Sequence, residues 1–251
     1  MAGGWWCCCS EGCFNYLDDF CRDTNYFPKL GPHWRIVSPS VAGIKEDEPP
    51  YWPWWIFTAD CPDFPPGYLI EDGHPGATLI CADAIPRGPE NPDKSDPYSH
   101  HMAAFINVIA DEDGDEYSLL VDYCCNDAGG YDYLEFRYTR VNSGTVSLKL
   151  LSYINGSETT LRECVITEVT LLGAGFSLQA CLSKGLFTGY YGSEHITVIH
   201  SGLSRGHVPD CRFPAYHAGI RHNHPHSSPH QTAICITAST LATANMPGNY
   251  R

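Results

Sequence analysis

The strongest constraint in this sequence is an alternation of apolar and polar residues with a period of two. It runs through residues 132–140 and 145–154, whose apolar members are Leu134, Phe136, Tyr138, Val146, Leu148 and Leu150. Successive side chains of a β-strand point to opposite faces, so each segment predicts a strand with one buried face. Residues 142–144 (NSG) between the two segments predict a hairpin connection.

Other segments have the same strand character and are separated by turn-rich links. Strands are predicted at 54–59, 77–84, 100–110, 116–123, 159–171, 175–182, 185–190, 195–200, 215–221 and 231–239, with a first hairpin over 33–45. An Asp-Gly step inside Asp111–Glu116 predicts a hairpin turn that joins 100–110 to 116–123. The 23 glycines and 19 prolines are typical of an all-β chain, and no segment has convincing helical periodicity.

These patterns predict an all-β protein with two antiparallel sheets packed face to face, because that arrangement buries the apolar face of every strand. A chain of 251 residues is long enough for one sizeable sandwich. We predict a cysteine-rich N-terminal arm over residues 1–17, the sandwich domain over 18–240 and a C-terminal tail over 241–251.

The charge of the chain excludes several classes of partner. The formal net charge is -14, with 15 Lys and Arg residues. Nucleic-acid binding needs clustered basic residues, so no nucleic-acid partner is expected, and an anionic membrane surface is equally disfavoured. No segment approaches the ~20 apolar residues of a membrane span. The opening MAGGWWCCC lacks the features of a signal peptide, so we expect assembly without signal-dependent export.

The N-terminal arm is rich in cysteine and tryptophan. The chain has 13 cysteines, an odd number, and those of the arm follow a tryptophan pair: Trp5, Trp6, Cys7, Cys8, Cys9 and Cys13. In an oxidising location, an odd count leaves one thiol free or bonded to another chain. The arm cysteines are candidates for disulfides within the chain or to a neighbouring subunit, for thiolate ligands of zinc, or for free thiols. The tryptophan pair predicts contact with a partner chain, because a short arm has little core of its own.

Several motifs resemble one known family. The run DDF-x-R…LG-x-x-W-x-I-V at Asp18–Val37, then LEFRYTR, VSLKLLSY and FSLQACLSKGLFTGYYG, resembles concanavalin A-like, laminin-G-type lectin domains of bacterial and phage surface proteins. The resemblance covers about residues 18–240 and implies a jelly-roll sandwich with an affinity for surfaces or glycans. Cys21 after DDF and a long 200–216 loop depart from the family pattern. The resemblance transfers no ligand, because a fold does not fix a function.

No motif in the sequence predicts catalysis. Glycosidases of this fold carry Glu-x-Asp-x-x-Glu on one strand, which places both carboxylates in the cleft, and that run is absent. The acidic segment Asp111–Glu116 has three interpretations: a calcium site, a catalytic site or a solvated turn. The solvated turn is the preferred one. We therefore expect that the protein is not an enzyme.

Two further groups are candidates for binding. His222, His224 and His226 alternate, so on an extended strand they would share a face and could bind a divalent metal; Pro225 favours a polar loop instead. Trp52, Trp54 and Trp55 would stack on sugar rings if they are exposed, or plug one end of the sandwich if they are buried. Apart from that metal, no cofactor is expected.

The function predicted from these observations is a non-enzymatic structural or adhesion subunit of a surface assembly, most simply a phage virion or tail component. Such a protein needs no signal peptide and commonly forms a homo-oligomer or binds other structural subunits. The alternative is an extracellular carbohydrate-binding, lectin-like module that recognises a cell-surface glycan, and a polysaccharide-cleaving enzyme is a weaker third. The expected location is a virion or an extracellular surface assembly.

Overall fold

The computed structural model describes the backbone of residues 14–18, 34–38, 54–57, 68–71, 77–81, 101–108, 113–126, 129–169, 176–183, 185–200, 203, 217–223 and 236–243. Side chains are described from residue 113 to 223 within these ranges, with Ser183 excepted, and before residue 113 only at Val37 and Thr78.

Every regular element of the described chain is a β-strand. The strands are β1 (Phe14–Asp18), β2 (Trp34–Ser38), β3 (Trp54–Phe57), β4 (Tyr68–Glu71), β5 (Ala77–Cys81), β6 (His101–Val108), β7 (Glu116–Cys125), β8 (Tyr131–Asn142), β9 (Thr145–Ile154), β10 (Ser157–Thr167), β11 (Phe176–Ser183), β12 (Leu186–Tyr191), β13 (Glu194–Ile199), β14 (His217–Asn223) and β15 (Ile236–Thr243). The prediction of an all-β chain is confirmed. Within these ranges there is no helix long and apolar enough to cross a bilayer.

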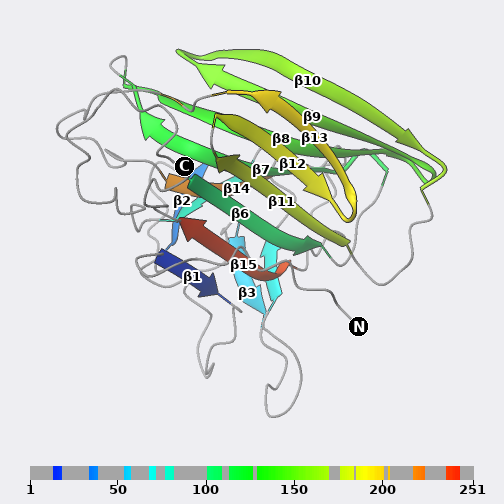
Figure 1. Cartoon of the computed structure of the whole chain (residues 1–251). Helices are drawn as coiled ribbons and strands as arrows, with labels where there is room; N and C mark the ends of the chain where they lie inside the picture. The colour runs from blue at the N-terminus through cyan, green and yellow to red at the C-terminus, as the bar shows by residue number, and fades with distance from the viewer. Residues whose placement is uncertain are drawn as a thin grey trace, which may run out of the picture.

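The strands form two sheets, and every pair is antiparallel. Sheet A has the order β13-β12-β11-β6-β15-β4-β3, with β1 also paired to β15, and sheet B has the order β10-β9-β8-β7-β14-β5-β2. Figure 1 shows the sheets stacked as two layers, with β10 and β13 at the same edge of the stack. The predicted two-sheet jelly-roll sandwich is therefore confirmed.

One continuous apolar core fills the space between the sheets. Its fully buried members in the central strands of sheet B include Leu119, Leu134, Phe136, Leu148 and Leu150, and those in sheet A include Leu178, Ala180 and Phe187. The alternation in the sequence produced this arrangement, since all six of the apolar residues singled out above in 132–140 and 145–154 belong to the core between the sheets. Each fully buried side chain of this size contributes roughly 1.5–3 kcal/mol.

A glycine sets how closely the two layers approach. A methyl group built on Gly189 of β12 would overlap the ring of Phe136, which lies across the core on β8. Phe136 is fully buried, so its ring has little room to shift. The bare backbone at Gly189 is thus what allows sheet A to pack against this ring.

The predicted hairpin between 100–110 and 116–123 is wrong. β6 lies in sheet A between β11 and β15, while β7 lies in sheet B between β8 and β14, so the chain crosses from one sheet to the other between them. The acidic segment is not simply a solvated turn either. Asp113 is exposed and pairs with Arg140 at 3.0 Å, but Asp115 is fully buried.

The ends of the predicted domain also differ from the observed strands. β1 begins at Phe14, inside the predicted arm, and pairs with β15 along its whole length. β15 runs to Thr243, inside the predicted tail. β2 pairs with β5, and the second half of the hairpin predicted over 33–45 lies outside the described residues.

Candidate functional site

The outer face of sheet B, which points away from sheet A, carries a row of four tyrosines. We call Tyr131, Tyr123, Tyr133 and Tyr153 the tyrosine row. Tyr131 and Tyr133 lie two residues apart on β8, and Tyr153 is the cross-strand neighbour of Tyr133 on β9. Because side chains alternate along a strand, these three share the face opposite the core.

A β-bulge brings the fourth tyrosine to the same face. The register of β7 against β8 shifts between Val121 and Cys124, so that two residues of β7 lie opposite Tyr133. Asp122 adopts the left-handed conformation there, with φ at 54°, and its Oδ2 accepts a hydrogen bond from the Leu203 backbone N–H at 2.8 Å. Without this extra residue Tyr123 would point inward, as Val121 does. The bulge therefore completes the row.

The rings of the row stack on one another. Tyr123 is 4.9 Å from Tyr131 and 5.5 Å from Tyr133, and Tyr133 is 4.9 Å from Tyr153 with an interplanar angle of 11° (centroid distances). Each such pair adds about 0.5–1.5 kcal/mol beyond the area it buries. Leu120, Tyr123 and Cys125 form a small second hydrophobic cluster on this face. Tyr153, at one end of the row, has one described ring partner, Tyr133, and its side chain is half-buried.

Burial changes the acidity of Tyr133, in the middle of the row. Desolvation, with a smaller contribution from the nearby Glu135 carboxylate, raises the pKa of Tyr133 from 10.0 to about 12. The phenol therefore stays protonated at any physiological pH and can donate a hydrogen bond.

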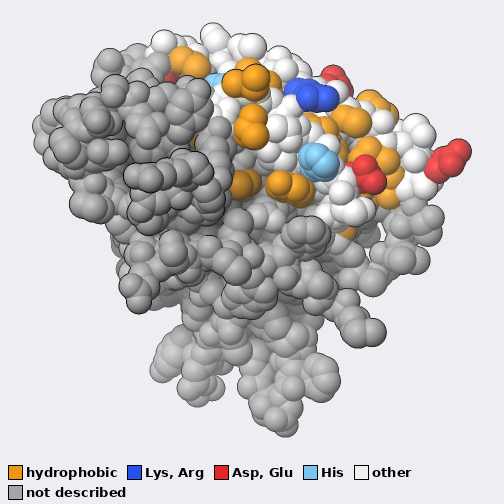
Figure 2. All heavy atoms as spheres, viewed as in Figure 1, with side chains coloured by type: hydrophobic (Ala, Val, Ile, Leu, Met, Phe, Trp, Pro, Cys, Tyr) orange, Lys and Arg blue, Asp and Glu red, His pale blue; other side chains and the backbone are white. Residues whose placement is uncertain are grey.

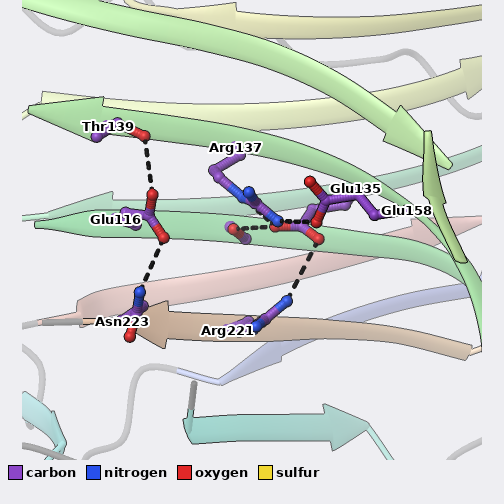
Figure 3. Close-up of polar contacts among 8 residues, drawn as sticks. Glu116, Glu135, Arg137, Thr139, Glu158, Arg221 and Asn223 are labelled. Atoms are coloured by element: carbon purple, nitrogen blue, oxygen red, sulfur yellow. Dashed lines mark hydrogen bonds and ion pairs between the residues drawn. The ribbon is translucent and has the colours of Figure 1, made fainter. Parts of the chain in front are cut away.

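Beside the row lies a network of charged groups centred on Glu135 (Figure 3). Glu135 Oε1 accepts hydrogen bonds from Ser118 Oγ at 2.6 Å and from Arg137 Nε at 2.7 Å. Its Oε2 lies 3.7 Å from Arg221 Nη1 of β14. Arg137 Nη2 in turn donates to Glu158 Oε2 of β10 at 2.8 Å. These five residues, which we call the charge network, connect four strands of sheet B.

The charge network surrounds the Glu135 carboxylate with hydrogen-bond donors and cations, out of reach of solvent. The Glu135 side chain is only 1% exposed, so an unpaired charge there would be strongly destabilising. Burial by itself lowers the pKa of Arg137, but the hydrogen bonds and charges of Glu135 and then Glu158 outweigh it and hold that pKa above its ordinary value. Arg137 is thus a permanent cation locked between two carboxylates.

Two smaller groups of contacts extend this polar surface. Glu116 of β7 accepts hydrogen bonds from Asn223 at 3.0 Å and from Thr139 at 3.5 Å, as Figure 3 shows. On β9 and β10, the Lys149 ammonium lies 3.4 Å from Glu163. The accessible part of the face is on the β9–β10 side, where the Glu158 and Glu163 side chains are 43% and 45% exposed.

Chemically, this face can stack an apolar ring surface on Tyr153 and exchange hydrogen bonds beside it. Tyr153 is the register partner of Glu158, so the half-buried ring and a carboxylate lie on neighbouring strands. Among the described residues there is no group of three or more side chains arranged to hold a metal ion.

The site residues expected from the sequence lie elsewhere. Trp54 and Trp55 are on β3 in sheet A, on a short strand whose side chains are not described, and Trp52 lies outside the described residues. The arm residues Trp5, Trp6, Cys7, Cys8, Cys9 and Cys13 also lie outside them. Their proposed roles stay predictions.

Of the three histidines considered for metal binding, His222 is described and lies in the core. It is fully buried on the inner face of β14, with its ring 4.8 Å from that of Tyr117 and its Nε2 4.0 Å from Asp115 Oδ1. His224 and His226 are outside the described residues. Of the scattered cysteines, Cys125 is disulfide-bonded, whereas Cys124, Cys164 and Cys181 carry thiols.

The outer surface of sheet A has a different character. Figure 2 shows hydrophobic side chains spread among polar ones on its described part, with few charged groups. The register partners Leu186 and Ile199, on β12 and β13, are 42% and 85% exposed. Arg162 of β10 reaches across the edge of the sandwich and donates to the Thr197 carbonyl at 2.7 Å.

No family model and no curated protein matches this sequence. Among solved structures, it is similar to the CBM2 module of the evolved Dit of Lactobacillus casei BL23 phage J-1, with a TM-score of 0.54, 11% identity, and coverage of 92% of this chain and 96% of that one. It is also similar to a prokaryotic β-1,3-1,4-glucanase (lichenase) derived from a mouse hindgut metagenome, with a TM-score of 0.45, 10% identity and coverage of 92% and 99%. A third is the carbohydrate-binding module CBM66 of Bacillus subtilis, with a TM-score of 0.39, 11% identity and coverage of 77% and 92%.

Carbohydrate-binding modules and enzymes thus both occur among the similar structures. At such identities the similarity concerns the fold, and it leaves ligand and activity open. The chain has an antiparallel two-sheet jelly-roll sandwich.

Proposed function

We propose that this protein is a non-enzymatic adhesion subunit of a surface assembly, most simply a phage particle, and that it binds glycan on the outer face of sheet B. The observation that carries the proposal is the tyrosine row beside the charge network, with the half-buried Tyr153 at the end of the row next to accessible polar groups. An apolar ring surface surrounded by donors and acceptors suits a pyranose, which has apolar faces and a rim of hydroxyl groups.

The similarity to the CBM2 module of a phage Dit protein supports both the location of the assembly and the ligand class. Both are offered by analogy of fold. The tyrosine row supports the ligand class independently, because it is a property of this chain.

The geometry of Glu135 supports the non-enzymatic part of the proposal. A general acid or base needs access to the substrate proton within about 2.6–3.2 Å. The Glu135 carboxylate is 1% exposed and both of its oxygens already contact Ser118, Arg137 or Arg221. Its neighbour Glu158 is exposed but bound to Arg137. Such a network is suited to positioning hydroxyl groups.

The direct test is titration of soluble polysaccharides by calorimetry, with Tyr153→Ala as the test variant. We expect saturable binding, weakened by about tenfold in Tyr153→Ala, because a central aromatic contact typically contributes more than ~1 kcal/mol to binding. Tyr190→Ala is the matched control, since Tyr190 is a tyrosine of sheet A that contacts His195. Equal binding by both variants, or no binding by the native protein, would contradict the proposal.

A purely structural subunit is the second candidate, favoured by the exposed pair Leu186 and Ile199 at an edge of sheet A. Exposed apolar residues on neighbouring strands can mark contact with another chain. Light scattering with and without reductant tests this alternative. A discrete oligomer that binds no glycan would favour it, and a glycan-binding monomer would exclude it.

A further inference from the structure

We infer that the glycan recognised by the outer face of sheet B is a neutral one, and that the carboxylates of this face exclude polyuronates and other anionic polysaccharides. The inference rests on the proposed glycan-binding function and concerns its specificity. It is carried by the pairing of the cations on the described strands of this face, β7 to β10 and β14.

Each of the three cations whose side chains lie on the outer face of these strands is already paired with a carboxylate. Arg137 contacts Glu135 and Glu158 at 2.7 and 2.8 Å, Arg221 lies 3.7 Å from Glu135, and Lys149 lies 3.4 Å from Glu163. Glu116 is a further carboxylate on the same strands, with amide and hydroxyl partners. The described part of the face therefore carries one more carboxylate than cations.

An anionic sugar would have to replace one of these carboxylates as the partner of a cation. Displacing Glu135 would leave its buried charge without compensation, which is strongly unfavourable. Displacing the exposed Glu158 or Glu163 would bring the sugar carboxylate close to a like charge. The net charge of -14 over the whole chain adds a long-range repulsion of polyanions.

A neutral sugar meets no such obstacle. Its hydroxyl groups both donate and accept hydrogen bonds, so they can donate to the exposed carboxylate oxygens of Glu158 while the ion pair with Arg137 stays intact. The ring face of Tyr153, on the strand next to Glu158, is available for stacking without any change in charge. Specificity here is thus a difference between the affinities for neutral and for anionic polysaccharides, produced largely by repulsion of the anionic ones.

The experiment is affinity gel electrophoresis of the whole protein in gels that contain either a neutral polysaccharide (mixed-linkage β-glucan, xyloglucan, galactan or mannan) or a polyuronate (alginate, polygalacturonate or hyaluronan). We expect retardation by at least one neutral polysaccharide and none by the polyuronates. Two variants, Glu158→Gln and Glu163→Gln, remove the exposed carboxylate partners of Arg137 and Lys149 and should bind polyuronate about two- to fivefold more strongly than the native protein, the scale of one exposed ion pair.

Glu194→Gln is the matched control, because it removes one negative charge at the exposed start of β13 in sheet A, away from this face. A polyuronate gain in the two test variants but not in Glu194→Gln supports the inference. Equal gains in all three variants, or native binding to polyuronate at least as strong as to any neutral polysaccharide, would overturn it and leave the proposed glycan-binding function standing. No retardation by any polysaccharide would overturn both. Unfolding curves of each variant show whether the fold is intact.

Discussion

The inner and outer faces of sheet B lie in different environments, and strand β8 contributes side chains to both faces. On its inner face Leu134, Phe136 and Tyr138 are fully buried against sheet A. On its outer face Glu135 is almost equally buried, but among Ser118, Arg137, Arg221 and stacked tyrosines. Burial alone therefore does not define the core of this protein. The inner face depends on close packing, and the outer face depends on paired charges and hydrogen bonds.

The largest loss of stability is expected from a substitution in the core, where the inner face of sheet B has no spare volume. Gly189→Ala would place a methyl group within the ring of the fully buried Phe136 and force the two sheets apart. We expect a loss of about 3 kcal/mol in the free energy of unfolding, at the upper end for overpacked cores. Urea denaturation followed by fluorescence measures it.

Gly144→Ala is the control for that change. Gly144 lies in the β8–β9 turn, and the nearest atom to an added methyl group is 4.0 Å away. Its free energy of unfolding should change by less than about 0.5 kcal/mol. Similar losses in both variants would show that the close approach at Gly189 does not limit the packing.

The next effect tests the outer face. Glu135→Gln keeps the shape of the side chain but leaves Arg137 and Arg221 without their buried counter-charge. Breaking a buried pair costs about 3–5 kcal/mol, and because Arg137 retains Glu158, we expect a loss of about 2 kcal/mol. The matched change Glu158→Gln removes an exposed carboxylate from the same arginine and should cost at most about 1 kcal/mol. If the two losses are equal, the burial of Glu135 has no energetic consequence.

The sequence predicted the inner face better than the outer one. Alternation identifies which residues of a strand share a face, so β8, β9 and β11 were placed correctly with their buried residues. It does not identify which strands pair. That is why an Asp-Gly step between β6 and β7 predicted a hairpin, although the chain changes sheets there.

The candidate site was missed for a related reason. The tyrosine row joins residues of three strands, and Tyr123 enters it only through the bulge at Asp122, where a non-glycine residue takes a positive φ. Period-two spacing of Tyr131 and Tyr133, with Tyr153 in the next predicted strand, was a signal for part of the row. The denser tryptophan cluster at 52–55 attracted the prediction instead, because aromatic density is visible in a sequence and cross-strand register is not.

The smallest predicted effect concerns Tyr133. It changes the free energy of unfolding only in alkaline solution. Burial raises its pKa in the folded protein from 10.0 to about 12, so its phenol is neutral in both the folded and unfolded states below pH 10. Between pH 10 and 12 the unfolded chain loses this proton and the folded protein keeps it, so the stability contributed by the raised pKa is lost as pH rises through this window.

Tyr133→Phe removes the titrating group and should reduce the slope of unfolding free energy against pH above 10 while leaving the slope at pH 7–9 unchanged. Urea unfolding at a series of pH values measures both slopes, with Tyr190→Phe as the control on sheet A. An unchanged alkaline slope in Tyr133→Phe would mean that Tyr133 titrates like an exposed phenol, and that the outer face is open to water at the centre of the row as well as at Tyr153.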